Sequence, residues 1–238
     1  MKTLVILFFS WLVAFGYARC QTIENAPLKY VEIFSTGFDG SRIAYHIQPE
    51  GRYTEIKGSP YLSDEWINGA IQLKTDSVPS PFRMRYNIYG NEMQFIYLKD
   101  TFAVSNPYKV AAVWLENRRF EYLSFVINEN QQYAYFEVMV DGPYRLLKLH
   151  GARLDAGRDP VTPYHCQNST DRFVKTESWY YQSEAMPVPE ALPGSARSLS
   201  RIFQKSIPGL LEQMKTMRFR IHRETDLVRI FSWMNEQK

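Results

Sequence analysis

GSPYLSDEWINGAIQLKTDSVPSPFRMRYNIYGNEMQFIYL, residues 58–98, is the stretch of this chain with the clearest strand pattern. In its second half, Phe82, Met84, Tyr86 and Ile88 are separated by two arginines and an asparagine. A two-residue alternation of apolar and polar side chains is typical of a β-strand that buries one face. The sequence therefore predicts a strand here.

A tight turn and a return strand complete a predicted β-hairpin. Residues 89–92 (YGNE) form the turn, because Gly and Asn tolerate the positive φ angles of a short connection. The alternation resumes at Met93, Phe95 and Tyr97. Upstream, residues 66–74 predict another strand, in which Gly69 indicates a bulge or the close approach of another backbone.

Further runs with strand-like alternation flank the hairpin, and each break between them contains turn-forming residues. Aromatic residues make up 15% of the chain and concentrate in these runs, as strand preferences predict. We therefore expect a mainly β fold, either a curved antiparallel sheet or a half-barrel meander. The predicted strands are 42–47, 109–115, 120–127, 133–140 and 144–154, with a further strand pair around 172–182.

The pattern changes near the C-terminus. Residues 186–194 (MPVPEALPG) contain three prolines and are predicted to be extended or looped. Apolar residues in 207–214 and in 227–234 are spaced for helices, with Ser206 and Thr225 as the predicted caps. The predicted organisation is a signal peptide at 1–20, an antiparallel β domain at 21–185, a Pro-rich linker at 186–194 and a helical segment at 195–238 packed on the sheet.

Residues 1–20 have the layout of a secretory signal peptide. Lys2 precedes a mostly apolar run at 4–15, which is too short to span a membrane, and Cys20 ends the segment. A bacterial lipoprotein would be anchored through Cys20, but Arg19 stands where such signals have a small residue. We expect cleavage after Cys20, with lipidation as the alternative, and a periplasmic or outer-membrane-associated location in a Gram-negative bacterium.

Cleavage changes both the charge and the cysteine content. The chain has 28 basic and 25 acidic residues, and losing Lys2 and Arg19 leaves a net charge of +1. A nearly neutral chain gives no electrostatic reason to expect a nucleic-acid partner or binding to an anionic membrane. Cys166 is then the only cysteine, which excludes an intrachain disulfide and predicts a free thiol without a chemical role.

Several short motifs resemble a known group of sequences. They are GSPYL at 58–62 followed by Trp66 and Gly69, YNIY at 86–89, YFEV at 135–138 before Asp141 and Gly142, and TDL at 225–227 followed by Asn235. In these features the chain resembles a group of uncharacterised exported proteins of Bacteroidetes-type bacteria. The resemblance implies export and a β-rich fold, and it implies no activity.

No catalytic or metal-binding pattern stands out in the sequence. His46, His150, His165 and His222 are scattered, without the spacing of a metal site, so no metal or cofactor is predicted. The segment 155–159 (DAGRD) places Gly and Arg where a calcium loop needs oxygen ligands. Cys166 adjoins His165, but catalytic partners must face each other, and chain neighbours normally do not. A carboxylate pair assembled by the fold remains open.

Three other features have both a functional and a structural interpretation. Arg83 and Arg85 could contact an anion, but a solvated strand face with cross-strand partners such as Glu92 is favoured. The basic residues of 215–223 alternate with apolar ones and could dock a partner, but an amphipathic edge strand is favoured. The last feature is a set of tryptophans that could line a pocket but are predicted to belong to the core, namely Trp66, Trp114, Trp179 and Trp233.

The function predicted from the sequence is that of an exported, non-enzymatic cell-envelope protein that binds a partner protein or supports envelope structure. One alternative is a carrier or sensor that holds an apolar small molecule inside the curved sheet. A second alternative is a hydrolase with a carboxylate pair assembled by the fold. The sequence predicts no catalytic residue and identifies no ligand-binding residue.

Overall fold

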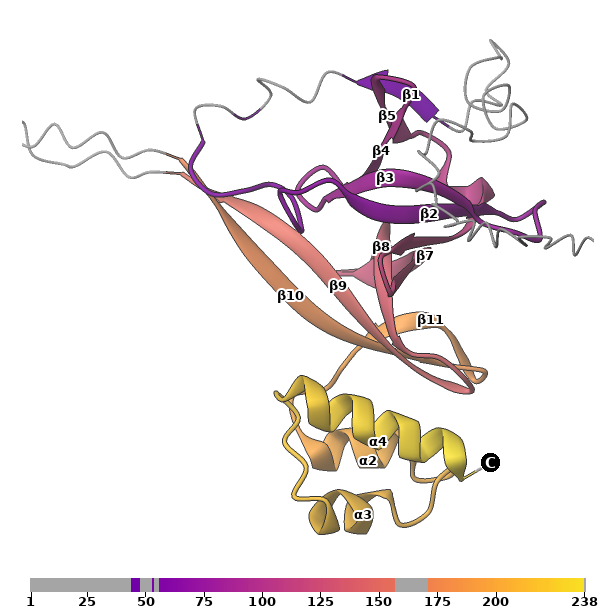
Figure 1. Ribbon diagram of the computed structural model, residues 1–238. Helices are drawn as coiled ribbons and strands as arrows, with labels where there is room; N and C mark the ends of the chain where they lie inside the picture. The colour runs from indigo at the N-terminus through magenta and orange to yellow at the C-terminus, as the bar shows by residue number, and fades with distance from the viewer. Residues whose placement is uncertain (1–43, 48–52, 54–55, 157–170, 238) are drawn as a thin grey trace, which may run out of the picture.

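A computed structural model of the protein describes residues 44–47, 53, 56–156 and 171–237. Within these ranges the chain forms one antiparallel sheet of eleven strands, one short 3-10 helix and three α-helices. Figure 1 shows the strongly twisted sheet with the helices gathered together beneath one end of it. The prediction of a mainly β fold with an antiparallel sheet and C-terminal helices is confirmed.

The elements follow one another in the chain as β1 (Ala44–Ile47), β2 (Ile67–Leu73), β3 (Ser80–Asn87), β4 (Glu92–Tyr97), β5 (Asp100–Val104), the 3-10 helix η2 (Pro107–Lys109), β6 (Val110–Leu115), β7 (Arg118–Ile127), β8 (Asn130–Val140), β9 (Tyr144–Asp155), β10 (Arg172–Ser183), β11 (Met186–Ala191), α2 (Ala196–Phe203), α3 (Leu210–Thr216) and α4 (Glu224–Glu236).

The order of strands across the open sheet is β1-β5-β4-β3-β2-β6-β7-β8-β9-β10-β11. From β6 to β11, strands that are adjacent in the chain are also adjacent in the sheet, as in the predicted meander. The first half departs from a meander because β2 pairs with β3 on one side and with β6 on the other. β11 also lies against β7, so the second half of the sheet curls back on itself.

The predicted hairpin is β3 and β4, with Met84 opposite Phe95 and Tyr86 opposite Met93. Asn91 in the turn has a φ of 53°, one of the positive angles expected there. Gly69 in β2 marks a close approach, as predicted, because a Cβ atom at this position would lie 2.5 Å from the Trp114 carbonyl oxygen.

Two strand predictions need correction. The segment around 172–182 is not a strand pair, because β10 is a single strand that pairs with β9 over its whole length and with β11 on its other side. β5 was not predicted, since its short DTFAV sequence follows a turn closely and has little alternation.

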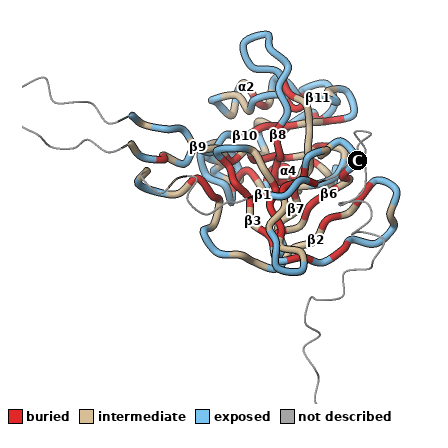
Figure 2. Tube along the Cα trace, turned by 90° about the horizontal axis from the view of Figure 1, so that it is seen from above, coloured by how far each residue is buried: buried red, intermediate tan, exposed pale blue. Residues whose placement is uncertain are grey.

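The sheet has an inner face, defined as the face that carries Phe120, Glu137 and Lys148, and an outer face that carries Phe136 and Leu147. One apolar core fills the inner face of β1–β8, and a second lies between the inner face of β8–β10 and the helices. A smaller core lies on the outer face of β7–β10. Figure 2 shows the buried residues following the strands and the exposed ones in the connections.

Residues 195–237 form a helical cap on the sheet. Ser195 begins α2, and its side chain accepts a hydrogen bond from the Ser198 N–H at 3.1 Å. Asn235 in α4 fastens the cap to the sheet, because its side-chain oxygen accepts from the Tyr144 N–H at 2.8 Å. Its amide nitrogen donates to the carbonyls of Asp141 and Tyr144. None of the described helices has the length and apolar character needed to span a membrane.

Both predicted helix caps are wrong. Ser206 does not cap α3, because the N–H groups of Ser206 and Ile207 complete the end of α2 by donating to the Phe203 carbonyl at 3.0 and 2.8 Å. Gly209, with a φ of 85°, precedes α3 instead. Thr225 lies inside the first turn of α4, which begins at Glu224.

The predicted edge strand at 215–223 is also wrong. Residues up to Thr216 belong to α3, and the rest form an irregular connection in which Arg218 has a φ of 52°. The apolar side chains of Met217, Phe219 and Ile221 pack against the helical core. Their alternation therefore arises from a connection that touches the core repeatedly, and not from a strand.

The first six residues of the predicted linker at 186–194 belong to the sheet and are not part of a linker. Residues 186–191 are extended, as the prolines suggest, but they form β11 at the edge of the sheet. An edge strand accommodates proline because not every N–H group is needed for pairing. The connection between sheet and cap is therefore only 192–194. The predicted signal peptide at 1–20, His165 and Cys166 lie outside the described residues.

Candidate functional site

A row of charged side chains crosses the inner face between the two apolar cores. The strand register places Phe120, Glu137, Lys148 and Trp179 opposite one another across β7, β8, β9 and β10. His150, two residues beyond Lys148, therefore shares this face. We call Arg118, Glu137, Lys148, His150, Glu177 and Glu224 the inner ion cluster.

Glu137 is the centre of the inner ion cluster and is almost completely buried. Arg118 donates two hydrogen bonds to its carboxylate, from Nε and Nη2, both at 2.7 Å. The His150 Nε2 atom lies 2.7 Å from Oε2 of the same carboxylate. Burial alone would raise the pKa of Glu137, but the hydrogen bonds from Arg118 and His150 outweigh it and lower the pKa to about 2. Glu137 is therefore held as a carboxylate.

Lys148 joins the sheet to the cap. Its ammonium group is buried and lies 2.8 Å from Glu177 Oε2 on β10 and 3.0 Å from Glu224 Oε2 at the start of α4. Burial acts to lower the pKa of Lys148, but the two carboxylates outweigh it and raise the pKa. The same ammonium group lies 5.1 Å from the centre of the Trp179 ring, within cation–π distance.

This arrangement suits a structural role better than acid–base catalysis. A carboxyl group that donates a proton to a substrate needs a raised pKa, which burial next to apolar groups or next to a second carboxylate produces. Glu137 has the opposite environment, because a guanidinium and an imidazole contact it. The ion pairs of the cluster instead stabilise the charged side chains that lie on the inner face between the two apolar cores.

A second ionic group lies on the outer face near the β8–β9 turn. Arg145 contacts Glu121 at 2.8 Å and Asp141 at 3.0 Å, and Arg119 contacts Asp141 at 2.7 Å. Burial acts to raise the pKa of Asp141, but Arg145 and the neighbouring donors lower it overall. Both carboxylates of this group are therefore paired with arginine side chains.

Two exposed tyrosines and one half-buried tyrosine form an aromatic surface on the inner face of the β7–β8 hairpin. Tyr122 and Tyr133 are stacked with ring centres 6.0 Å apart. Tyr108 of η2 makes edge contacts with both rings, at 5.4 and 5.2 Å. Tyr108 is 54% exposed and Tyr133 is 38% exposed. We call these three residues the tyrosine surface.

The tyrosine surface is held from below by buried aromatic rings. Tyr122 contacts Tyr135 at 4.9 Å, and Tyr135 contacts Tyr86 at 5.7 Å. Tyr86 and Tyr135 are both buried and belong to the first core. The exposed rings of Tyr108 and Tyr133 and the half-buried ring of Tyr122 therefore stand on a base of buried aromatic side chains.

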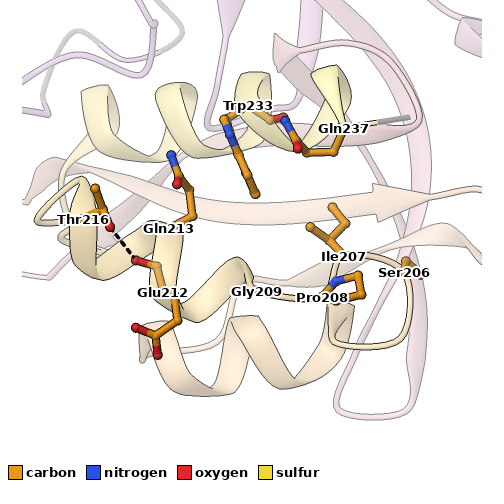
Figure 3. A pocket seen from close by; sticks show the side chains of 9 residues that line it. All are labelled: Ser206, Ile207, Pro208, Gly209, Glu212, Gln213, Thr216, Trp233 and Gln237. Carbon is orange, nitrogen blue, oxygen red and sulfur yellow. Dashed lines mark hydrogen bonds between the residues drawn. The ribbon is translucent and has the colours of Figure 1, made fainter.

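The helical cap contains a pocket of about 340 Å³ between α3 and α4. Figure 3 shows the Trp233 indole pointing from α4 toward α3, with Gln213 and Gln237 on either side of it. The remaining lining includes Ser206, Pro208 and Thr216. The Thr216 hydroxyl donates a hydrogen bond to the Glu212 carbonyl at 3.0 Å.

Arg83 and Arg85 lie on the outer face, opposite their apolar neighbours, as predicted. Arg83 donates to the Trp66 carbonyl. Arg85 is less solvated than expected, because its guanidinium lies 3.6 Å from the centre of the Tyr61 ring and 4.4 Å from that of Trp66. Its cross-strand partner is Gln94, at 3.2 Å, and not Glu92 directly.

The four tryptophans are only partly buried, so the prediction that they belong to the core needs correction. Trp179 and Trp233 flank the second core, and each also lines a pocket. Trp66 covers Arg85. A large ring at the margin of a core remains half-exposed when neighbouring strands or helices cover only one of its sides.

The histidines are not brought together in the described part of the chain. His150 is buried in the inner ion cluster, while His46 and His222 are exposed on β1 and before α4. Among the described residues no group of three His, Cys, Asp or Glu side chains could hold a metal ion. Asp155 contacts Arg172 at 3.2 Å, and residues 157–159 of the DAGRD segment lie outside the described residues.

Sequence patterns missed both the inner ion cluster and the tyrosine surface. Glu137, Lys148 and His150 occupy apolar-face positions of their strands, and this interruption of the alternation was the available signal. The tyrosines carried no such signal, because aromatic residues are common throughout the strands.

Comparison with known proteins places the chain in no family, since no family model, no curated protein and no solved structure matches it.

Proposed function

We propose that this protein is an exported, non-enzymatic protein of a Gram-negative cell envelope that binds a partner protein through its tyrosine surface. The observation that carries the proposal is the mutual packing of Tyr108, Tyr122 and Tyr133 at an exposed position. Tyrosine is enriched at the centres of protein interfaces, because it buries a large ring at a small cost in conformational entropy.

Two properties of the tyrosine surface support contact with a protein. Val126, on the same strand and the same face as Tyr122, is 57% exposed, so this face of β7 carries a further exposed apolar side chain. The rim is polar, because Gln131 donates to the Tyr133 hydroxyl at 3.0 Å. An apolar centre with a hydrogen-bonding rim is the usual composition of a binding interface.

The two alternative functions have less support. The inner face of β1–β8 is filled by the first core, in which Met84, Met93 and Phe95 have no exposed surface. An apolar ligand therefore has no space there among the described residues. The hydrolase hypothesis needs a carboxyl group with a raised pKa, whereas Glu137 and Asp141 both have lowered values.

Site-specific photo-crosslinking tests the proposal. A photoreactive phenylalanine derivative at Tyr108 should yield a discrete crosslinked product in the host cell, because this ring is central to the surface. The matched control is the same derivative at Val78, which is 68% exposed on the β2–β3 connection. The proposal fails if position 108 yields no product, or if positions 78 and 108 yield the same products.

A second variant separates binding from folding. Tyr108→Ala combined with Tyr133→Ala should abolish recovery of the crosslinked partner from a reporter at position 126, while circular dichroism stays unchanged. Retained crosslinking in a folded double variant would show that the partner does not contact the tyrosine rings.

A further inference from the structure

The helical cap has an excess of positive charge that the whole chain conceals. Residues 195–237 contain eight basic and four acidic side chains, although the complete sequence is almost balanced. Two of the basic residues are paired, Lys215 with Glu212 at 2.7 Å and Arg229 with Asp226 at 3.3 Å. The other six are exposed and form no ion pair within the described residues, namely Arg197, Arg201, Lys205, Arg218, Arg220 and Arg223.

Two of these unpaired cations line one groove. Arg197 and Arg201 are four residues apart on α2, so they lie on the same face of the helix. Together with Gln204 they form one wall of a groove of about 300 Å³. Leu211 and Glu212 of α3 belong to its lining, and the Glu212 carboxylate is occupied by Lys215.

The surroundings of the groove are both cationic and apolar. Ile202, next to Arg201, is 38% exposed although it is a large aliphatic residue. Leu211 is half-buried in the groove itself. Lys205 follows Arg201 by four residues, just beyond the end of α2, and extends the positive charge along the same side.

We propose that this groove binds the phosphate head group of an anionic lipid and docks the cap on the surface of a bilayer. Two arginines at i and i+4 can share one phosphate, because each guanidinium presents several N–H donors in a fixed plane. The adjacent aliphatic side chains suit the region just below the head groups, where apolar side chains are stable. Each Lys or Arg near an anionic bilayer contributes about 1 kcal/mol to binding, and the other unpaired cations of the cap add to the two arginines of the groove.

This groove fits a bilayer better than it fits a nucleic acid or an acidic peptide. Single-stranded nucleic acids are usually bound by exposed aromatic rings that stack on the bases, and the groove is lined by none. An acidic peptide would leave Ile202 and Leu211 against charged groups. The net charge of the whole chain gave no reason to expect an anionic membrane, because it averages the basic cap with a sheet that has slightly more acidic than basic residues.

Co-sedimentation with vesicles tests the proposal on the full-length protein. We expect binding to vesicles that contain one third phosphatidylglycerol in phosphatidylcholine, no binding to pure phosphatidylcholine, and weaker binding in high salt. The variant Arg197→Gln/Arg201→Gln should lose about tenfold or more in affinity for the anionic vesicles. Lys74→Gln/Lys99→Gln is the matched control, because it removes the same charge from exposed lysines of the sheet and should bind normally.

Several results would overturn the proposal. They are equal binding to neutral and anionic vesicles, no binding to either, or equal losses in the groove variant and in the sheet control. Inorganic phosphate that displaces the protein from vesicles at low concentration would make free phosphate the ligand. Duplex DNA that binds as tightly as the vesicles, with the same loss in Arg197→Gln/Arg201→Gln, would make the cap a nucleic-acid surface. The groove and the tyrosine surface share no residue. A failure to bind vesicles would therefore leave the photo-crosslinking result at Tyr108 unchanged.

Discussion

The sheet and the helical cap use their charged side chains in opposite ways. On the sheet, Glu137 is buried and contacts the guanidinium of Arg118 and the imidazole of His150. Lys148 is also buried and contacts two carboxylates. On the cap, Arg197 and Arg201 are exposed and contact no carboxylate within the described residues. The comparison separates charges that stabilise the fold from charges that remain available to a ligand.

The reason for the difference lies in the topology. A row of opposite residues across four strands brings side chains of distant segments within hydrogen-bonding distance, so unlike charges pair and become buried. Among the described residues no element faces the outer surfaces of α2 and α3, and the cations of α2 are exposed. Substitutions on the sheet, on the cap and at the contacts between them test this difference.

The largest effect is expected for Glu137→Gln. It removes the negative charge that pairs with Arg118 and contacts His150, and breaking a buried pair in this way costs about 3 kcal/mol of unfolding free energy. Urea unfolding followed by circular dichroism measures the loss. The control is Glu65→Gln, an exposed residue whose change should stay within about 0.5 kcal/mol. Equal effects of the two variants would contradict a structural role for the cluster.

A smaller loss of about 2 kcal/mol is expected for Asn235→Ala. This substitution removes three hydrogen bonds between α4 and the β8–β9 turn and leaves the Tyr144 N–H without its acceptor. Because the bonds join the two regions, cap amides should also exchange faster with solvent. Gln237→Ala at the end of α4 is the control and should be neutral. A neutral Asn235→Ala would mean that the cap is held by apolar contacts alone.

Lys148→Met should cost only about 1 kcal/mol or less. The methionine fills the space of the lysine stem, and Glu177 and Glu224 are half-exposed, so water can solvate their carboxylates. The unfolding free energy should also depend less on salt than in the unmodified protein. Lys99→Met on the β4–β5 turn is the control for the change in charge. A loss as large as that of Glu137→Gln would show that the two ends of the cluster are equally buried.

The smallest effect on stability is expected for Arg197→Gln/Arg201→Gln, within about 0.5 kcal/mol, since both side chains are exposed and unpaired. The same urea titration measures it, with Lys74→Gln/Lys99→Gln alongside. Together with the vesicle experiment, this result would separate ligand binding from folding. A marked loss of stability would indicate that the cations hold α2 and α3 together.

Much of the fold could be predicted because the strands alternate cleanly. Met84 and Tyr86 identify the buried face of β3, and Gly69 identifies the close approach of β6. The insertion of β2 between β3 and β6 could not be predicted, because strand order depends on contacts between segments far apart in the chain. The prediction of a strand at 215–223 was wrong for a related reason. In the irregular connection at 217–223 every second side chain contacts the helical core, which produces the same alternation as a strand.

Much less of the candidate sites than of the fold could be predicted from the sequence. Glu137 meets Lys148 and His150 only through the register of β8 against β9, and the interrupted alternation of each strand does not reveal that register. The charge of the cap was present in the sequence, but the net charge of the whole chain concealed it. Counting charge by region would have revealed the excess at 195–237.

The titration of Glu137 tests most directly whether the charges of the sheet are structural. The carboxyl carbon can be followed by ¹³C NMR in the folded protein, with Glu65 as an exposed reference. We predict a pKa of about 2 instead of the ordinary 4.5. Because the pKa is lower in the folded protein, the stabilisation is complete above pH 4.5 and is lost as the pH falls toward 2. A Glu137 carboxyl that titrates at or above pH 4.5 while the protein is folded would contradict this account and make the residue a candidate for acid–base chemistry.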